Sequence, residues 1–527
     1  MYCVVGSGPA GIACAQALLK AGAKVTLLDA GARLEPEREA RLASLRALPL
    51  ERWTPESLGF LREGVAVTAA GIPMKRAYGS DFPFREPAPL PLGHHGVEGK
   101  PSYARGGLSN VWGASVMPFR RQDMDGWPIA LEDLEPHYRA VLVEMPFSAR
   151  ADRLGTDFPL YHDHPATLRE SSQAAALLRD LEARHARLLD RGVSFGASRL
   201  AVQGSSNGKK GCIYCAQCMY GCPFGYIYNS ADMIERLRAE GGFEYRPGVL
   251  VEEVVEAGGG VVVKGRELGS GAPLDVRADR VFLACGVFST ARVLLASLDA
   301  YGRKVRALDN CYFLFPLLRY RRQKEAARES LHTLAQVFLE IDDAAIGSHT
   351  THLQVYTHNE LFRKQVGNML GAVDSVLGPA VERLLLARML LVQGYLHSDL
   401  SPGMTLTLAR GVGGQPDVLE LAGTPNSQAR PAISAVLRRL RAERSSLRAF
   451  PLGQALRVGA PGRGFHTGGT FPMSASPGPF ETDAMGRPSG MSRVHVVDAS
   501  VFPSLPATTI TLSVMANAHR IGAEAAA

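Results

Sequence analysis

The sequence predicts an α/β fold in which a doubly wound, Rossmann-type domain is interleaved with a second domain built on an antiparallel sheet. Two observations predict the first domain: a strand–glycine–helix–strand unit over residues 2–29, and a further strand, glycine turn and helix over residues 280–295. Alternating apolar and polar residues over 333–341, 351–357 and 404–409 predict strands of the second domain. A chain of 527 residues exceeds the size of one ordinary core, so two domains are expected.

The N-terminal unit has the residue order of a dinucleotide-binding turn. Gly6 permits the tight turn, Gly8 lets the backbone approach a pyrophosphate, and Gly11 lets the helix pack closely on the strand. The phosphates would lie on free N–H groups at the helix N-terminus, where the dipole favours negative charge. Asp29, at the end of the second strand, can accept hydrogen bonds from ribose hydroxyls. The expected cofactor contacts also include Pro9, Ala10 and Ala30.

The charge balance is mildly basic, with 58 basic and 51 acidic side chains and a net charge of +7. This small excess is spread over a large surface, so nucleic acid is not expected as a partner. Two local basic runs stand out, at residues 319–324 and 438–448. A solvated helix face is one interpretation of these runs, and an anionic partner or a lipid surface is the other.

A cytoplasmic location is expected, because residues 3–5 already belong to the first strand and leave no room for a targeting segment. The most apolar segment, 376–396, contains Glu382, Arg383 and Arg388. Charged side chains are costly in hydrocarbon, so a membrane-spanning helix is not expected there. The segment predicts a buried or interface helix, and peripheral contact with a membrane surface is the alternative.

Several sequence blocks resemble the glucose-methanol-choline (GMC) oxidoreductases, and they follow the order of that family along nearly the whole chain. Besides the N-terminal unit, the blocks are 106–113 (GGLSNVWG), 127–138 (WPIALEDLEPHY), 466–470 (HTGGT) and 496–503 (VVDASVFP). In the family the first of these lies along the flavin, and the last two belong to the active-site region. The resemblance therefore implies FAD as the cofactor, with a variable substrate region over about 311–455.

The resemblance also implies which loops contact FAD. The pair Gly106–Gly107 would let the backbone lie flat against a ring system. The strand 249–255 would offer backbone groups to the adenine, although ordinary sheet core explains it equally well. The last helix, expected from Thr508, would direct its N–H groups at the flavin, with simple helix capping as the other interpretation. The implied FAD contacts are Gly106, Gly107, Asn110, Val111, Trp112, Gly113, Val251, Ala284, Gly286, Asp498, Ala499, Thr508 and Thr509.

The chemistry that the resemblance implies is removal of hydride from an alcohol carbon, which also requires a base for the hydroxyl proton. His466 is the candidate base, because an unperturbed imidazole pKa lies near the working pH. Relatives place a second His or Asn eleven residues after the Asp that corresponds to Asp498, and here that position is Thr509. A threonine hydroxyl can orient the substrate oxygen but cannot become a cation. The residues that could substitute are His349, His352, His358 and His397, although a structural role is expected for each.

Four of the eight cysteines, Cys212, Cys215, Cys218 and Cys222, form a C-x2-C-x2-C-x3-C-P run that is typical of bacterial iron–sulfur proteins. Catalytic subunits of bacterial FAD-dependent sugar dehydrogenases in the GMC family have a similar segment, although Cys215 sits differently in their pattern. The resemblance thus implies a cluster that relays electrons from flavin to a cytochrome or quinone. Disulfides, zinc bound by four thiolates, and free thiols remain open, as does a cluster ligand from the distant Cys285 or Cys311.

The leading hypothesis is a dehydrogenase that oxidises a sugar, a polyol or another alcohol and passes electrons to a protein or quinone acceptor. An oxidase that uses oxygen is the nearest alternative, and a non-redox flavin lyase is a third, favoured by Thr509. The FAD-binding domain is expected to comprise residues 1–32, 100–126, 200–310 and 456–527. The α+β substrate-binding domain, on an antiparallel sheet, is expected to comprise residues 33–99, 127–199 and 311–455.

Overall fold

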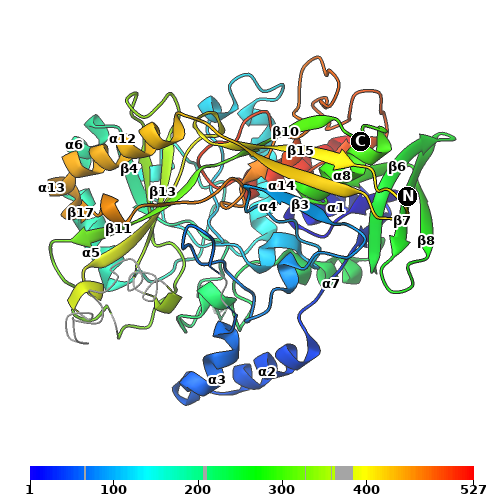
Figure 1. Cartoon of the computed structure of the whole chain (residues 1–527). Helices are drawn as coiled ribbons and strands as arrows, with labels where there is room; N and C mark the ends of the chain where they lie inside the picture. Colours follow the sequence, from blue (N-terminus) through cyan, green and yellow to red (C-terminus); the bar gives the residue numbers. More distant parts are fainter. Residues whose placement is uncertain (65–66, 206–209, 327, 358, 362–383, 527) are drawn as a thin grey trace.

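The computed structural model describes residues 1–526 except 65–66, 206–209, 327, 358 and 362–383 (Figure 1). Within this part of the chain, the strands form four sheets. The helices are α1 (Pro9–Lys20), α2 (Pro36–Ala47), α3 (Pro55–Gly59), α4 (Leu131–Glu144), α5 (Ser172–Glu182), α6 (His185–Asp190), α7 (Ser230–Glu240), α8 (Val287–Ser297), α12 (Ala429–Ala442), α13 (Arg444–Leu447) and α14 (Thr511–Ala526).

A five-stranded parallel sheet confirms the expected Rossmann-type unit. Its order is β20-β9-β1-β2-β5, so the first strand of the chain lies between the second strand and one that comes much later in the sequence. The strands are β1 (Tyr2–Val5), β2 (Val25–Asp29), β5 (Phe243–Pro247), β9 (Arg280–Leu283) and β20 (Val494–Val496). Because the strands are parallel, their carboxyl ends meet at one edge, where ligands bind in this architecture.

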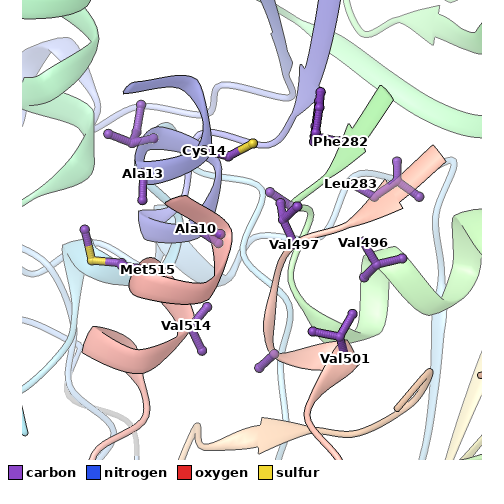
Figure 2. Packing of buried hydrophobic residues seen from close by; sticks show 14 of the residues in the cluster. Ala10, Ala13, Cys14, Phe282, Leu283, Val496, Val497, Val501, Val514 and Met515 are labelled. Atoms are coloured by element: carbon purple, nitrogen blue, oxygen red, sulfur yellow. The ribbon is translucent and has the colours of Figure 1, made fainter. Parts of the chain in front are cut away.

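Small side chains let two helices pack closely beside this sheet. The helix α1 contacts α14, the last helix of the chain, and α14 also contacts α4. A Cβ atom at Gly522 of α14 would lie only 2.9 Å from the carbonyl oxygen of Cys14 in α1, so this approach requires glycine. Figure 2 shows side chains from α1, α14 and the ends of β9 and β20 gathered in one apolar core. The N- and C-terminal segments of the chain therefore share a single core.

A second, antiparallel sheet has the order β17-β11-β14-β13-β12-β4, with β18 also paired to β11. Its strands are β4 (Val193–Ala197), β11 (Tyr312–Arg319), β12 (Val337–Ile341), β13 (Thr351–Tyr356), β14 (Met389–Tyr395), β17 (Ala449–Pro451) and β18 (Arg457–Val458). The strands expected within 333–341 and 351–357 are β12 and β13. All residues of both strands are buried, so this sheet is covered on both faces.

A mixed sheet joins strands from both sets of segments that the sequence analysis assigned to separate domains. Its order is β19-β10-β15-β16-β3, and β16 pairs with β3 in parallel. The strands are β3 (Leu92–His95), β10 (Lys304–Asp309), β15 (Gly403–Ala409), β16 (Val418–Thr424) and β19 (Thr467–Gly468). The strand expected at 404–409 therefore pairs with β10 of the cofactor segments, and a boundary at residue 310 would run through this sheet. A separate antiparallel sheet contains β6 (Val249–Ala257), β7 (Gly260–Glu267) and β8 (Pro273–Ala278).

The helix expected over 376–396 is wrong for the described residues of that segment. Residues 389–395 form β14, an inner strand of the antiparallel sheet, and residues 376–383 lie outside the described chain. A strand buried on both faces is apolar throughout, so its sequence resembles that of a buried helix. Among the helices that the structure describes, none has the length and apolar composition needed to cross a bilayer.

Candidate active site

A large cavity connects the N-terminal glycine turn with the C-terminal histidine motif. Its wall includes residues of the turn, the loop 106–113, the start of α14, and the strands β11, β13 and β14. Of the residues predicted to contact FAD, all line this cavity except Gly11, Gly106, Asn110 and Thr508. Segments from both ends of the chain and from its middle therefore converge on one site.

The glycine turn leaves space only on the side of the cavity. Gly6 has φ of 99°, and a Cβ atom there would lie 2.5 Å from the carbonyl oxygen of Ala284. A Cβ atom at Gly11 would overlap the carbonyl oxygen of Gly6, so Gly11 packs the helix against the turn. Gly8 differs, because its φ is −63° and a Cβ atom there would meet nothing within 4 Å. No side chain caps the first N–H groups of α1, which begins directly after Gly8.

Asp29 is held by a chain of hydrogen bonds that the sequence did not reveal. The hydroxyls of Ser7 and Tyr245 both donate to Asp29 Oδ2, over 2.5 and 2.9 Å. The Ser7 oxygen in turn accepts the backbone N–H of Gly106 at 2.8 Å. Burial raises the pKa of the Asp29 carboxyl to about 6. The acid therefore joins the second strand, the glycine turn and the loop 106–113 into one unit.

Two of the predicted contact residues support the loop 106–113 from behind. Asn110 donates its side-chain amide to the carbonyl oxygens of Arg105 and Gly107, over 3.0 and 2.7 Å. Its own amide oxygen accepts from Asn229. Gly106 has a left-handed φ of 85°, which glycine adopts without strain. Both residues thus fix the shape of the loop, while the five residues 107, 108, 109, 111 and 112 face the cavity.

Asp498 connects two further parts of the cofactor side. Its Oδ2 accepts the Gly286 N–H at 2.9 Å and the Thr290 hydroxyl at 2.6 Å, while Oδ1 accepts the Ser500 N–H. Burial raises the pKa of this carboxyl. The acid therefore anchors the N-terminus of α8, whose first residues also line the cavity.

His466 and Thr509 both line the cavity and both present a buried polar atom without a hydrogen-bond partner, Nδ1 and Oγ1 respectively. The ring of Tyr395 stacks on the His466 ring with centroids 4.9 Å apart. Burial lowers the pKa of His466 to about 3, so the expectation of a value near the working pH is wrong for this environment. Thr508 is buried but lies off the cavity wall, and the last helix begins at Thr511, later than expected.

Sequence analysis missed the polar residues that the antiparallel sheet contributes to the cavity. They are Tyr312 of β11, Gln354 and Tyr356 of β13, and Gln393 and Tyr395 of β14. Positions two apart on a strand share one face, so each of the last two strands directs a pair of polar groups at the cavity. The signal in the sequence was the alternation of glutamine and tyrosine within otherwise apolar strands.

The histidines of the middle region do not line the cavity. His352 is fully buried, with Nδ1 2.6 Å from Glu340 Oε1, and its Nε2 lies 3.2 Å from Gln354 Nε2. The rings of His349 and His397 stack face to face at 3.6 Å. His358 lies outside the described residues. His352 therefore acts behind the wall, where it helps to orient Gln354.

The four cysteines of the run are free, as are all eight in the chain. Two residues between them, Tyr214 and Ala216, have left-handed φ of 60°, so the run follows successive tight turns. Among the described residues, no three of the sulfurs lie within 4.8 Å of one another, whereas tetrahedral zinc would hold four thiolates about 3.8 Å apart. Burial raises the pKa of Cys212 and Cys215 to about 12.

A buried lysine lies between the cysteine run and the loop 106–113. Lys75 donates from Nζ to the carbonyl oxygen of Trp112 at 2.6 Å and lines the cavity. Burial lowers the pKa of Lys75 to about 8, while Cys218 and Cys222 act in the opposite direction. Met219, within the run, also lines the cavity. The run thus adjoins the cavity wall, whereas Cys311 belongs to the core of the antiparallel sheet.

Comparison with known families matches two parts of this chain. Residues 434–518 match the family model described as GMC oxidoreductase, and residues 4–34 match that of an NAD(P)-binding Rossmann-like domain. The first match includes His466 and Thr509, and it supports the resemblance to GMC oxidoreductases. It says nothing of the cysteine run, which lies outside both matches. A search of curated protein sequences gave no match.

Solved structures of two oxidases share the fold over nearly the whole chain. Pyridoxine 4-oxidase from Mesorbium loti is 16% identical, with a TM-score of 0.60, and the match covers 99% of this chain and 98% of that one. Formate oxidase from Aspergillus oryzae RIB40, studied for its FAD modification, is 14% identical with a TM-score of 0.62 and coverage of 99% and 97%. At this level of identity the likeness establishes the fold alone.

Proposed function

We propose that this chain is an FAD-dependent oxidoreductase that oxidises a hydroxyl group of a sugar, a polyol or another alcohol. The observation that carries this proposal is the single cavity whose wall contains both the dinucleotide turn and His466 with Thr509. The uncapped start of α1 fits a pyrophosphate, because its free N–H groups need an acceptor. Asp29, near the carboxyl end of the sheet, fits the ribose.

In this proposal FAD supplies the hydride acceptor, and the protein positions the substrate and moves its proton. His466 accepts the hydroxyl proton, and its low pKa keeps the imidazole neutral and able to do so. Thr509 directs Oγ1 at the substrate oxygen, which it can orient as donor or acceptor. Gln354 and Tyr356 supply hydrogen bonds to other hydroxyls of the substrate. These polar groups favour a polyhydroxylated substrate over a simple apolar alcohol.

Replacing Gly8 with alanine tests the position of the pyrophosphate. The protein should fold normally, because Gly8 has an ordinary φ and its added Cβ meets no protein atom within 4 Å. Flavin binding should nevertheless weaken at least about tenfold, because the methyl group would occupy the approach of the phosphate. Flavin content and affinity are measured on the purified protein. Gly59→Ala is the matched control, since Gly59 also has open space but lies outside the cavity. Unchanged affinity in Gly8→Ala would contradict this placement.

We further propose that the cysteine run holds an iron–sulfur cluster and that the enzyme passes electrons through it to a protein or quinone acceptor. The spacing of four free cysteines and the tight turns between them support this proposal. Their separation exceeds that of a zinc site, and a cuboidal cluster places iron and sulfide between its ligating sulfurs. The buried amino group of Lys75 would offset part of the negative charge of such a centre.

An oxidase that transfers electrons to oxygen is the second candidate function. It is favoured by the two structural neighbours, which are named as a pyridoxine oxidase and a formate oxidase. A flavin lyase has only the absence of a second His or Asn at Thr509 in its favour. A cytoplasmic location remains a prediction of the sequence.

The absorbance spectrum of protein purified without oxygen, before and after acid treatment, tests both proposals. We expect flavin bands superimposed on a broad brown absorption that acid destroys, together with stoichiometric iron and acid-labile sulfide. Flavin bands alone would remove the cluster and favour the oxidase. Absence of flavin, even after reconstitution with FAD, would overturn the function proposed here.

A further inference from the structure

The fold brings the two basic runs of the sequence together at one end of the molecule. The strand β11 pairs with the edge strand β17, so that Arg319 lies opposite Ala449. Beyond the strand, the N–H of Tyr320 donates to the carbonyl oxygen of Arg448. The runs 319–324 and 438–448, more than a hundred residues apart in the chain, thus become neighbours (Figure 1, where β11, β17, α12 and α13 gather at one end).

Some of these basic residues are structural and do not act as a helix face. Arg319 is buried, and it donates to the carbonyl oxygen of Leu447 and to Asp180. Arg439 forms an ion pair with Asp343, and Arg448 lies in the left-handed region at the end of α13. The remaining basic residues are exposed and, within the described chain, form no ion pair: Arg321, Arg322, Lys324, Arg438 and Arg444.

Exposed apolar side chains lie among these cations. Tyr320 is 48% exposed and Phe450 is 37% exposed, although residues of this size are usually covered. Leu318 lies opposite Phe450 across the strand pair, and Tyr320, two residues further on, continues the same face. The guanidinium of Arg441 lies 5.9 Å from the Phe450 ring. Cations and aromatic rings therefore alternate on a single surface.

We propose that this basic-aromatic surface docks the protein on a membrane that contains anionic lipids. The surface comprises Tyr320, Arg321, Arg322, Lys324, Arg441, Arg444 and Phe450. Clustered arginine and lysine side chains attract anionic headgroups, and amphipathic rings such as tyrosine are enriched at membrane interfaces. Glu325 is the exposed acidic residue of the same loop, and it leaves the cations in excess. This proposal does not depend on the flavin chemistry.

Co-sedimentation of the full-length protein with lipid vesicles tests the proposal. We expect binding to vesicles of phosphatidylcholine with about 30% phosphatidylglycerol, little binding to phosphatidylcholine alone, and loss of binding as salt screens the charges. The variant R321E/R322E/K324E should lower the partition coefficient at least about a hundredfold, because each cation near the surface contributes to attraction. Replacing Tyr320 and Phe450 with serine should lower the binding that persists at higher salt.

The variant R303E/K304E/R306E is the matched control. It makes the same change in net charge at three exposed residues at the start of β10, and it should bind anionic vesicles nearly as well as the unaltered protein apart from the general change in charge. Circular dichroism and flavin content confirm that each variant is folded. Equal losses in both triple variants would overturn the proposal, because net charge alone would then explain binding. Absence of binding to anionic vesicles at low salt, or retention only on an acidic protein or nucleic acid, would also overturn it.

Discussion

Replacing His466 with alanine is expected to lower the rate of substrate-driven flavin reduction at least about a hundredfold while the flavin content stays unchanged. The residue lines the same cavity as the glycine turn but makes no hydrogen bond through Nδ1, so its removal deprives the substrate of a proton acceptor without disturbing the cofactor side. Anaerobic stopped-flow absorbance, with a panel of sugars and polyols, measures this rate directly. An unaltered rate would place the base elsewhere.

Two controls separate a catalytic role of His466 from a structural one. Tyr395→Phe keeps the ring that stacks on His466 and should retain most of the rate. The pH dependence provides the second control, because a lowered pKa means that the neutral imidazole persists as pH falls and is lost only near the folded value of about 3. Flavin reduction should therefore show no decline attributable to His466 between pH 8 and about 5. A decline centred near 6.5 would contradict the buried environment described here.

Replacing Cys218 with serine is expected to remove the iron–sulfur cluster and thereby abolish electron transfer to a cytochrome or quinone, while substrate still reduces the flavin. Cys218 is buried in the middle of the run and lies close to Lys75, so a missing thiolate there leaves a gap in the ligand set. Iron and sulfide content, together with separate assays of flavin reduction and of acceptor reduction, measure the two effects independently.

Cys311→Ser is the control for this variant. Cys311 is equally buried, but it belongs to the core of the antiparallel sheet and lies outside the run. Its replacement should leave iron content and acceptor reduction unchanged. If the Cys218 variant kept both, the run would not serve electron transfer, and the oxidase proposal would gain support.

The sequence predicted much of the cofactor side because that side depends on local spacing. A strand, a glycine turn, a helix and an acid at the end of the next strand specify one another within thirty residues, and the parallel sheet confirms them. The middle region was less predictable. The apolar run at 389–395 suggested a helix, but its pairing with β11 and β13 makes it a strand, and such pairing depends on residues far away in the chain.

By itself, the sequence determined the Rossmann-type unit, the loop 106–113 and the candidate pair His466 and Thr509, since each lies in a motif of contiguous residues. Only the tertiary structure decided which polar residues join them, because Tyr312, Gln354 and Gln393 face the cavity through the register of three strands, and a slip of one residue would reverse each face. It also decided the pKa of His466, since burial and not residue type sets that value.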